Sequence, residues 1–182
     1  MSKSKAIYQL KVTLADIKPP IWRRIEVADC SLAKLHDIIQ ECMGWHGGHL
    51  WSFEIGGEDY GADPFGELDM ADPKKARLAK FVEAGYAKFN YTYDFGDNWI
   101  HHIVVEKVLD ADSKVRYPRC VKGARACPPE DCGGPWGYAD FLEAINNPGH
   151  ERHAEMMEWH SQSFDPERFE VGAINRNLVG IR

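Results

Sequence analysis

The segment FNYTYDFGDNWIHHIVVEKVL, residues 89–109, carries the clearest information about the fold. Two runs that alternate between apolar and polar residues, FNYTY and WIHHIVV, flank the short polar segment DFGDN. Alternation with a period of two is typical of half-buried strands, and Gly96 and Asn98 tolerate the backbone angles of a tight connection. The stretch therefore predicts a central β-hairpin.

The N-terminal part predicts a second hairpin followed by a helix. Residues 8–14 (YQLKVTL) and 21–27 (IWRRIEV) alternate in the same way, and a proline-containing turn joins them. Residues 32–43 (LAKLHDIIQECM) place their apolar side chains on one helical face. Ser31 is a suitable N-cap for this helix, and Gly44 is suited to end it.

The remaining segments complete a mixed pattern. Residues 49–55 resume strand character, whereas residues 56–85 are rich in Gly, Asp and Pro and predict a surface excursion with one short helix. Helices are expected after the loop that ends near residue 134, over 150–160 and near the end of 165–178.

Taken together, the pattern predicts one α+β domain that spans residues 1–182. We expect a mainly antiparallel sheet, built from the N-terminal hairpin, a strand after the first helix and the central hairpin, packed with about three to four helices. The sequence contains no internal repeat and no low-complexity tract that would mark a domain boundary.

Charge and composition restrict the classes of function. The chain has 22 basic and 28 acidic residues and a net charge of −6, which disfavours direct nucleic-acid binding outside a local patch such as Arg23-Arg24. No stretch approaches the roughly 18 apolar residues of a membrane span, and the N-terminus lacks a secretory pattern, so a cytoplasmic protein without membrane contact is expected. Five cysteines, an odd number, argue against a disulfide framework.

Residues 125–138 (RACPPEDCGGPWGY) form a loop with two interpretations. In the first, Gly134 and Pro135 begin a helix, and Glu130 and Asp131 accept hydrogen bonds from its free N–H groups. In the second, the loop binds zinc or another divalent metal through a set of sulfur and nitrogen donors: Cys120, Cys127, Cys132 and His101. The cysteine spacing lacks the paired C-x₂-C of a strong zinc motif, so the expectation is no cofactor, with a metal as the alternative.

Two further clusters hold polar side chains that could take part in catalysis or ligand binding. Asp94 and Asp97 flank the turn of the central hairpin, and His101 follows on its second strand. Carboxylates beside a histidine serve acid–base catalysis or metal binding, and they also cap turns. The second cluster, in the link before residues 49–55, has His49 between Trp45 and Trp51.

Several of these segments together resemble the plasmid pRiA ORF-three-like family, also labelled insertion-element passenger TnpR-like proteins. The resemblance runs from about Ile7 to Leu178 and is carried by KPPIWRRIEV, LAKLHDIIQECMGW, HLWSFEI, YTYDFGDNWIHHIVVE and ACPPEDCGGPWGYADFLEA. It implies a compact α+β domain, often encoded near mobile elements, with no established biochemical activity. The positions that match the family's motifs are His36, His49, Phe53, Asp94, Gly96, Asp97, Trp99, His101, Glu106, Pro129, Glu130, Asp131, Gly133 and Gly134.

The TnpR label suggests a resolvase, but the sequence argues against a serine recombinase. Such an enzyme needs an N-terminal nucleophilic serine among arginines and a basic DNA-binding tail, and neither is present. Templates for other enzymes, including the G-x-S-x-G elbow, the P-loop and H-E-x-x-H, are also absent, so the sequence favours a binding module over an enzyme.

We expect the central hairpin tip (94–101), the link (45–51) and the loop (127–134) to meet in one acidic cleft. Its ligand-binding candidates are Trp45, His49, Trp51, Asp94, Trp99, His101 and Glu130. The first hypothesis is a soluble binding domain of mobile-element biology that takes a small-molecule ligand or a protein partner. The second is a metal-assisted or acid–base hydrolase-like enzyme, with His49, Asp94, Asp97, His101, Glu130 and Asp131 as candidate catalytic residues. The third is a DNA-associated accessory factor of a transposable element that acts through Arg23, Arg24 and partner proteins.

Overall fold

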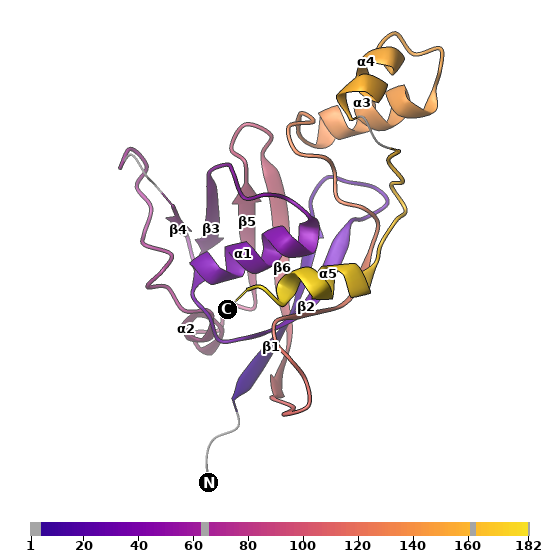
Figure 1. Ribbon diagram of the computed structural model, residues 1–182. Helices are drawn as coiled ribbons and strands as arrows, with labels where there is room; N and C mark the ends of the chain where they lie inside the picture. Colours follow the sequence, from indigo (N-terminus) through magenta and orange to yellow (C-terminus); the bar gives the residue numbers. More distant parts are fainter. Residues whose placement is uncertain (1–4, 63–65, 161–162, 182) are drawn as a thin grey trace.

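The protein is an α+β structure built on one sheet, as the sequence predicts. The computed structural model describes residues 5–62, 66–160 and 163–181 (Figure 1). In this part of the chain the strands are β1 (Ala6–Leu14), β2 (Trp22–Ala28), β3 (Trp51–Ile55), β4 (Glu58–Gly61), β5 (Lys88–Tyr93), β6 (Trp99–Asp110) and β7 (Arg119–Ala124). The helices are α1 (Leu32–Met43), α2 (Leu78–Glu83), α3 (Gly134–Asn146), α4 (His153–Trp159) and α5 (Val171–Leu178). Each of these five helices falls in a segment where the sequence predicts one, against an expected total of about three to four.

The strands form a single antiparallel sheet in the order β4-β3-β5-β6-β1-β2-β7. The predicted hairpins β1–β2 and β5–β6 are both present, and they lie side by side because β1 pairs with β6 over its whole length. The central hairpin β5–β6 thus connects the N-terminal hairpin on one side with β3 and β4 on the other.

One face of the sheet is buried under α1, which lies across it in Figure 1. Leu10, Tyr91 and Ile103 on three neighbouring strands are at most 1% exposed, and α1 turns its own buried residues towards the same core. The helix begins as expected, since the Ser31 hydroxyl accepts the Lys34 N–H at 3.2 Å. It ends at Gly44, whose φ of 93° is a left-handed conformation.

The opposite face of the sheet carries polar side chains. Arg24 on β2 forms a bidentate pair with Glu106 on β6, with distances of 2.5 and 2.8 Å. His102 Nδ1 lies 3.0 Å from Asn90 Oδ1 on the next strand. The sheet therefore has one apolar and one polar face, which explains the period-two pattern of its strands.

Residues 56–85 contain more regular structure than a simple excursion. Gly56 and Gly57, both with positive φ, join β3 to β4 as a two-residue hairpin turn. The short helix α2 follows, and its Leu78 is fully buried. Residues 63–65 of this segment lie outside the described residues.

The helices α3 and α4 pack on one another and stand beyond the end of the sheet (Figure 1). Phe141 and Met156 are buried there, and Phe141 also meets the ring of Trp159, with the ring centroids 5.6 Å apart. In contrast, α5 returns to the body and lies against β7 and α1. None of the helices among the described residues has the length and apolar character needed to cross a bilayer.

Candidate functional site

The register of the sheet brings the link before β3 against the tip of the β5–β6 hairpin. Trp51 pairs with Tyr93, and the Asp94 N–H donates to the Leu50 carbonyl oxygen at 2.8 Å. Antiparallel pairing continued by one step places Leu50 opposite Asp94, and the preceding residue, His49, therefore lies close to the Asp94 carboxylate. The loop between β7 and α3 reaches the same place, because the Trp45 indole N–H donates to the Pro128 carbonyl oxygen at 2.9 Å.

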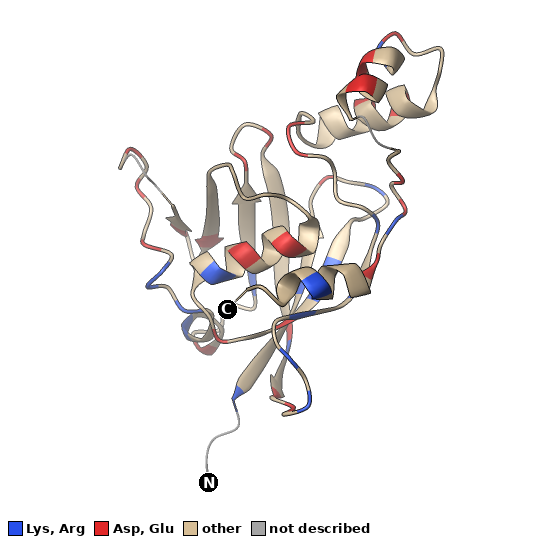
Figure 2. Ribbon diagram, in the orientation of Figure 1, with Lys and Arg blue, Asp and Glu red and all other residues tan. Residues whose placement is uncertain are grey.

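His49 lies between two carboxylates from two other segments. Its Nδ1 is 3.7 Å from Asp94 Oδ2, and its Nε2 is 3.2 Å from Asp131 Oδ1. Figure 2 shows acidic residues at both places, on the hairpin tip and on the loop that leads to α3. A neutral imidazole carries one N–H, so it can donate to only one of these carboxylates at a time.

The two carboxylates differ in how firmly they are held. Asp94 Oδ1 accepts the Gly96 N–H at 2.9 Å, and its side chain is 13% exposed, so Oδ2 is fixed towards His49. Asp131 has a side chain that is 69% exposed. The site thus combines one anchored carboxylate with one that is free to adjust to a ligand.

Glu130 fastens the loop to the rest of the site. Its Oε1 accepts the Tyr93 hydroxyl at 2.5 Å and the His46 N–H at 3.1 Å. Burial, together with this hydrogen bond to Glu130, raises the pKa of Tyr93, so the hydroxyl keeps its proton and continues to donate. Glu130 therefore holds the three segments together.

The start of α3 differs from the expected capping pattern. We expected Glu130 and Asp131 to accept its free N–H groups, but no side chain caps this helix in the usual way, and its N-cap is Gly133 rather than Gly134. Instead, the carboxylate of Asp97 binds the N-cap residue, since its Oδ2 accepts the Gly133 N–H at 3.1 Å. The capping carboxylate comes from the hairpin tip because the loop residues are turned towards His46 and His49.

Several aromatic candidates form a buried support beneath the site. Trp99 and His101 are at most 1% exposed, and Trp45 covers them with its ring 5.7 and 5.4 Å from theirs. Burial lowers the pKa of His101 to about 4, so the ring is neutral near neutral pH. These side chains position the link and the hairpin from below, and Trp45 also lines a pocket beside α1 together with His36 and Gln40.

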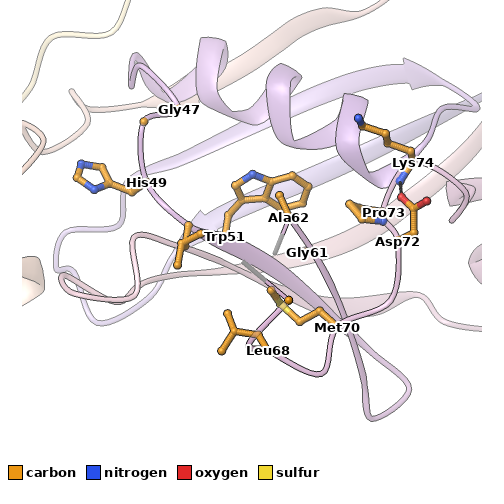
Figure 3. Close-up of a pocket in the computed structure, with 13 residues that line it drawn as sticks. Gly47, His49, Trp51, Gly61, Ala62, Leu68, Met70, Asp72, Pro73 and Lys74 are labelled. Carbon is orange, nitrogen blue, oxygen red and sulfur yellow. Dashed lines mark hydrogen bonds between the residues drawn. The ribbon is translucent and has the colours of Figure 1, made fainter. Parts of the chain in front are cut away.

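A pocket of about 920 Å³ opens beside His49 (Figure 3). Trp51, Met70 and Pro73 lie along it, and the carboxylate of Asp72 and the amine of Lys74 lie at its other end. The Trp51 indole is held in place by His36, whose ring stacks on it with 4.1 Å between centroids. The sequence did not single out residues 61–74 as a site, because their polar and glycine-rich composition is typical of any surface loop.

The structure does not group the thiols of the alternative zinc set. Among the described residues, the one group of three or more possible ligands with all donor atoms within 4.8 Å of one another is His49, Asp94 and Asp131. The thiols of Cys120, Cys127 and Cys132 are not part of this group.

The two arginines of the DNA hypothesis are both engaged within the fold. Arg23 is 3% exposed and donates to the carbonyl oxygens of Cys42, Trp22 and Ala124, each at 2.9 Å. Arg24 is paired with Glu106 on the polar face of the sheet. They point to opposite faces and therefore do not form one basic patch.

Comparisons with known proteins agree with the fold and give no activity. The model of the plasmid pRiA4b ORF-3-like protein family matches residues 6–173. The uncharacterized protein y4hQ of Sinorhizobium fredii (strain NBRC 101917 / NGR234) is 38% identical over 157 residues, covering 85% of this chain and 80% of that protein. The crystal structure of MM3350, a protein of unknown function from Methanosarcina mazei Go1, is similar with a TM-score of 0.85 and 37% identity, over 93% of this chain and 98% of that one. The chain belongs to the plasmid pRiA4b ORF-3-like family.

Proposed function

We propose that this protein is a binding domain whose ligand joins a cationic group to an apolar body. The cationic group lies against Asp94 and Asp131, and the apolar body lies in the pocket beside Trp51. The observation that carries this proposal is the position of His49 between two carboxylates from different segments, at the mouth of a pocket of about 920 Å³.

The charges support a cation. When His49 is neutral, its single N–H donates a hydrogen bond to one carboxylate, and the other carboxylate receives no hydrogen bond from the ring. Asp94 is held in place with its Oδ2 towards the site, so it cannot turn away to be solvated. A cation placed between the two carboxylates relieves their repulsion and makes charge-assisted hydrogen bonds.

The pocket walls support an apolar body. Trp51, Leu68, Met70 and Pro73 contribute apolar surface, and binding pockets generally combine such walls with a few placed polar groups. An association with mobile elements belongs to the same proposal and rests on the plasmid in the family's name.

A matched series of small probes tests the proposal. Phenylbutylamine, phenylbutanol and phenylbutyrate share an apolar body and differ in the charge of the head group. In a titration followed by amide NMR, the amine is expected to shift the signals of His49 and Trp51. It should bind about tenfold more tightly than the alcohol, because a charged hydrogen bond contributes about 1.5–3 kcal/mol. The anionic probe is expected not to bind.

Asp131→Asn should weaken binding of the amine about tenfold without affecting the fold, since Asp131 is exposed. Asp110→Asn is the matched control, because it removes the same charge at the far end of β6. Equal affinity of the amine and the alcohol, or an equal effect of the two substitutions, would contradict the cationic ligand.

A second candidate function is favoured by the donor atoms themselves. One imidazole nitrogen and two carboxylate oxygens lie within 4.8 Å of one another, a donor set that suits a first-row divalent metal such as Mn²⁺ or Zn²⁺. A metal held there would act as a Lewis acid for the hydrolase-like alternative. Calorimetry with each metal alone decides this: stoichiometric binding that His49→Gln abolishes, and that excludes phenylbutylamine, assigns the site to a metal.

A further inference from the structure

The largest exposed aromatic surface of the described residues lies on the first turn of α3. Trp136 is 89% exposed, whereas Trp45, Trp51 and Trp99 are buried. A single exposed hydrophobic residue is ordinary on a protein surface. Trp136 differs because it lines a cavity of about 710 Å³ whose other walls carry carboxylates.

This cavity has fixed walls. The β1–β2 turn contributes Asp16, the tip of the β5–β6 hairpin contributes Asp97, and the start of α3 contributes Pro135 and Trp136. The α3 start lies directly on the hairpin tip, since a Cβ on Gly134 would come within 2.4 Å of the Asp97 carbonyl oxygen. Asp97 Oδ2 accepts the Gly133 N–H, which fixes the orientation of its carboxylate.

The charge of the cavity selects a cation. Two carboxylates and no Lys or Arg are among the described residues that line it. A helix N-terminus by itself favours an anion, but here Asp97 already accepts the N–H of Gly133 and supplies the negative charge. The net charge of −6 also favours approach of a basic partner.

We propose that this cavity binds an arginine side chain of a partner protein, with the guanidinium stacked on the Trp136 indole and paired with Asp97 and Asp16. Arginine fits better than lysine because its planar group both stacks on an indole and forms a fork of hydrogen bonds to carboxylates. The indole is open and not enclosed by other rings, so it meets a side chain presented by a protein surface. Exposed tryptophans that become buried in this way are frequent centres of binding energy.

This surface is separate from the His49 site. Asp94 lies on the β5 side of the hairpin and faces the link before β3, whereas Asp97 faces α3 and lines the cavity with Asp16. The two sites therefore use different carboxylates of the same tip.

The test uses three short peptides of the same length, in which glycine alternates with arginine, lysine or glutamate. The readout is the indole N–H signal of Trp136 in nitrogen-edited NMR, identified by its loss in Trp136→Phe. The arginine peptide is expected to shift this signal until the site is saturated. It should bind several-fold more tightly than the lysine peptide, and its affinity should fall at high salt. The glutamate peptide is expected to leave it unmoved.

Asp97→Asn and Asp16→Asn keep the shape of the side chain, and Asn also tolerates the positive φ of 58° at Asp16. Each substitution should weaken the binding of the arginine peptide about fivefold or more. Asp110→Asn and Asp131→Asn should leave its affinity unchanged, which separates this surface from the His49 site. An unmoved Trp136 signal, binding of the glutamate peptide, or wild-type affinity in both Asp16→Asn and Asp97→Asn would overturn the proposal. Self-association that Trp136→Ala abolishes would overturn it in favour of a second copy of the chain.

Discussion

At the scale of single residues, two adjacent arginines show how the face of a strand decides a role. Arg23 and Arg24 follow one another in β2, and the strand turns them to opposite sides of the sheet. Arg23 lies inside, where burial lowers its pKa, and it joins the end of α1 to β2 and β7 through three carbonyl oxygens. Arg24 lies outside in a partly exposed pair with Glu106.

Replacement of each arginine by methionine should therefore differ in effect. Arg23→Met leaves three buried or half-buried carbonyl groups without their donor, so the free energy of unfolding should fall by about 3 kcal/mol or more. Arg24→Met removes a surface pair and should cost about 1 kcal/mol or less. Urea unfolding of both variants measures the difference, and equal losses would show that Arg23 does not hold these elements together.

The alternation of residues 21–27 already places Arg23 on the apolar face with Ile21, Ile25 and Val27. The pattern does not reveal its partners, because two of the three carbonyl oxygens belong to the end of α1 and to β7, which are distant in the sequence. A sequence predicts the direction of such a side chain but not the acceptors that satisfy it.

At the scale of elements, a buried histidine connects α1 with the sheet. His36 on α1 has its Nδ1 2.7 Å from the Tyr91 hydroxyl on β5, which also accepts the Gln40 amide at 2.9 Å. In the neutral tautomer that carries its proton on Nε2, His36 Nδ1 accepts the Tyr91 hydroxyl proton while the hydroxyl oxygen accepts from Gln40. Burial lowers the pKa of both His36 and His101 to about 4, from an ordinary value of 6.5.

These pKa values predict a loss of stability in mild acid. In the unfolded chain both histidines take up protons as the pH falls through about 6.5, while in the folded chain they stay neutral until about pH 4. Their contribution is complete above pH 6.5 and declines as the pH falls from 6.5 to 4, by up to roughly 3 kcal/mol for each histidine. Urea unfolding at several pH values across this window should show the decline.

Substitution separates the histidines from other groups. His36→Gln and His101→Gln should each reduce the pH slope, whatever their effect on stability at neutral pH, whereas His102→Gln on the exposed side of β6 should leave it unchanged. The Glu106 carboxyl, whose pKa Arg24 lowers, loses its contribution only below its ordinary value of 4.5 and lies outside most of the window. A wild-type slope in both buried variants would rule out this origin.

Two strands, β4 and β7, were not predicted from the sequence, and the reason differs between them. β4 is short and polar, but the pair Gly56-Gly57 after an alternating run is a typical two-residue hairpin signal that would have revealed it. β7 has no such signal. Its Gly123 is required by the fold, since a Cβ there would lie 2.6 Å from the Trp22 carbonyl oxygen, and only the pairing with β2 makes this visible.

At the scale of the whole molecule, the order of strands brings the site together. His49, Asp94 and Asp131 are far apart in the sequence, and their side chains meet because β3 pairs with β5 and the loop after β7 reaches over the hairpin tip. Local patterns identify each segment as polar and rich in loops, but they do not order the strands. The burial of Trp45, Trp99 and His101 depends in the same way on which segments cover them.

The arrangement in Figure 1 also predicts two levels of stability within one chain. The α3–α4 pair stands beyond the sheet and packs around Phe141, Ala144 and Met156, which are continuous with the hydrophobic core of the sheet. Its ties to the body run through the adjoining loops, by way of the bonds of Trp45 with Pro128 and of Asp97 with Gly133. A unit with few ties opens locally without unfolding the rest.

Native-state hydrogen exchange should therefore show faster exchange for the amides of α3 and α4 than for those of β1, β6 and α1. Phe141→Ala should accelerate exchange in α3 and α4 by on the order of 100-fold, because removal of a buried phenyl ring costs about 3 kcal/mol or more. Ile103→Ala, a comparable cavity in the main core, should instead accelerate the slowest amides of the sheet. If Phe141→Ala accelerated exchange equally in β1 and β6, the helical pair and the sheet would form one cooperative unit, and the loops between them would transmit stability as well as position.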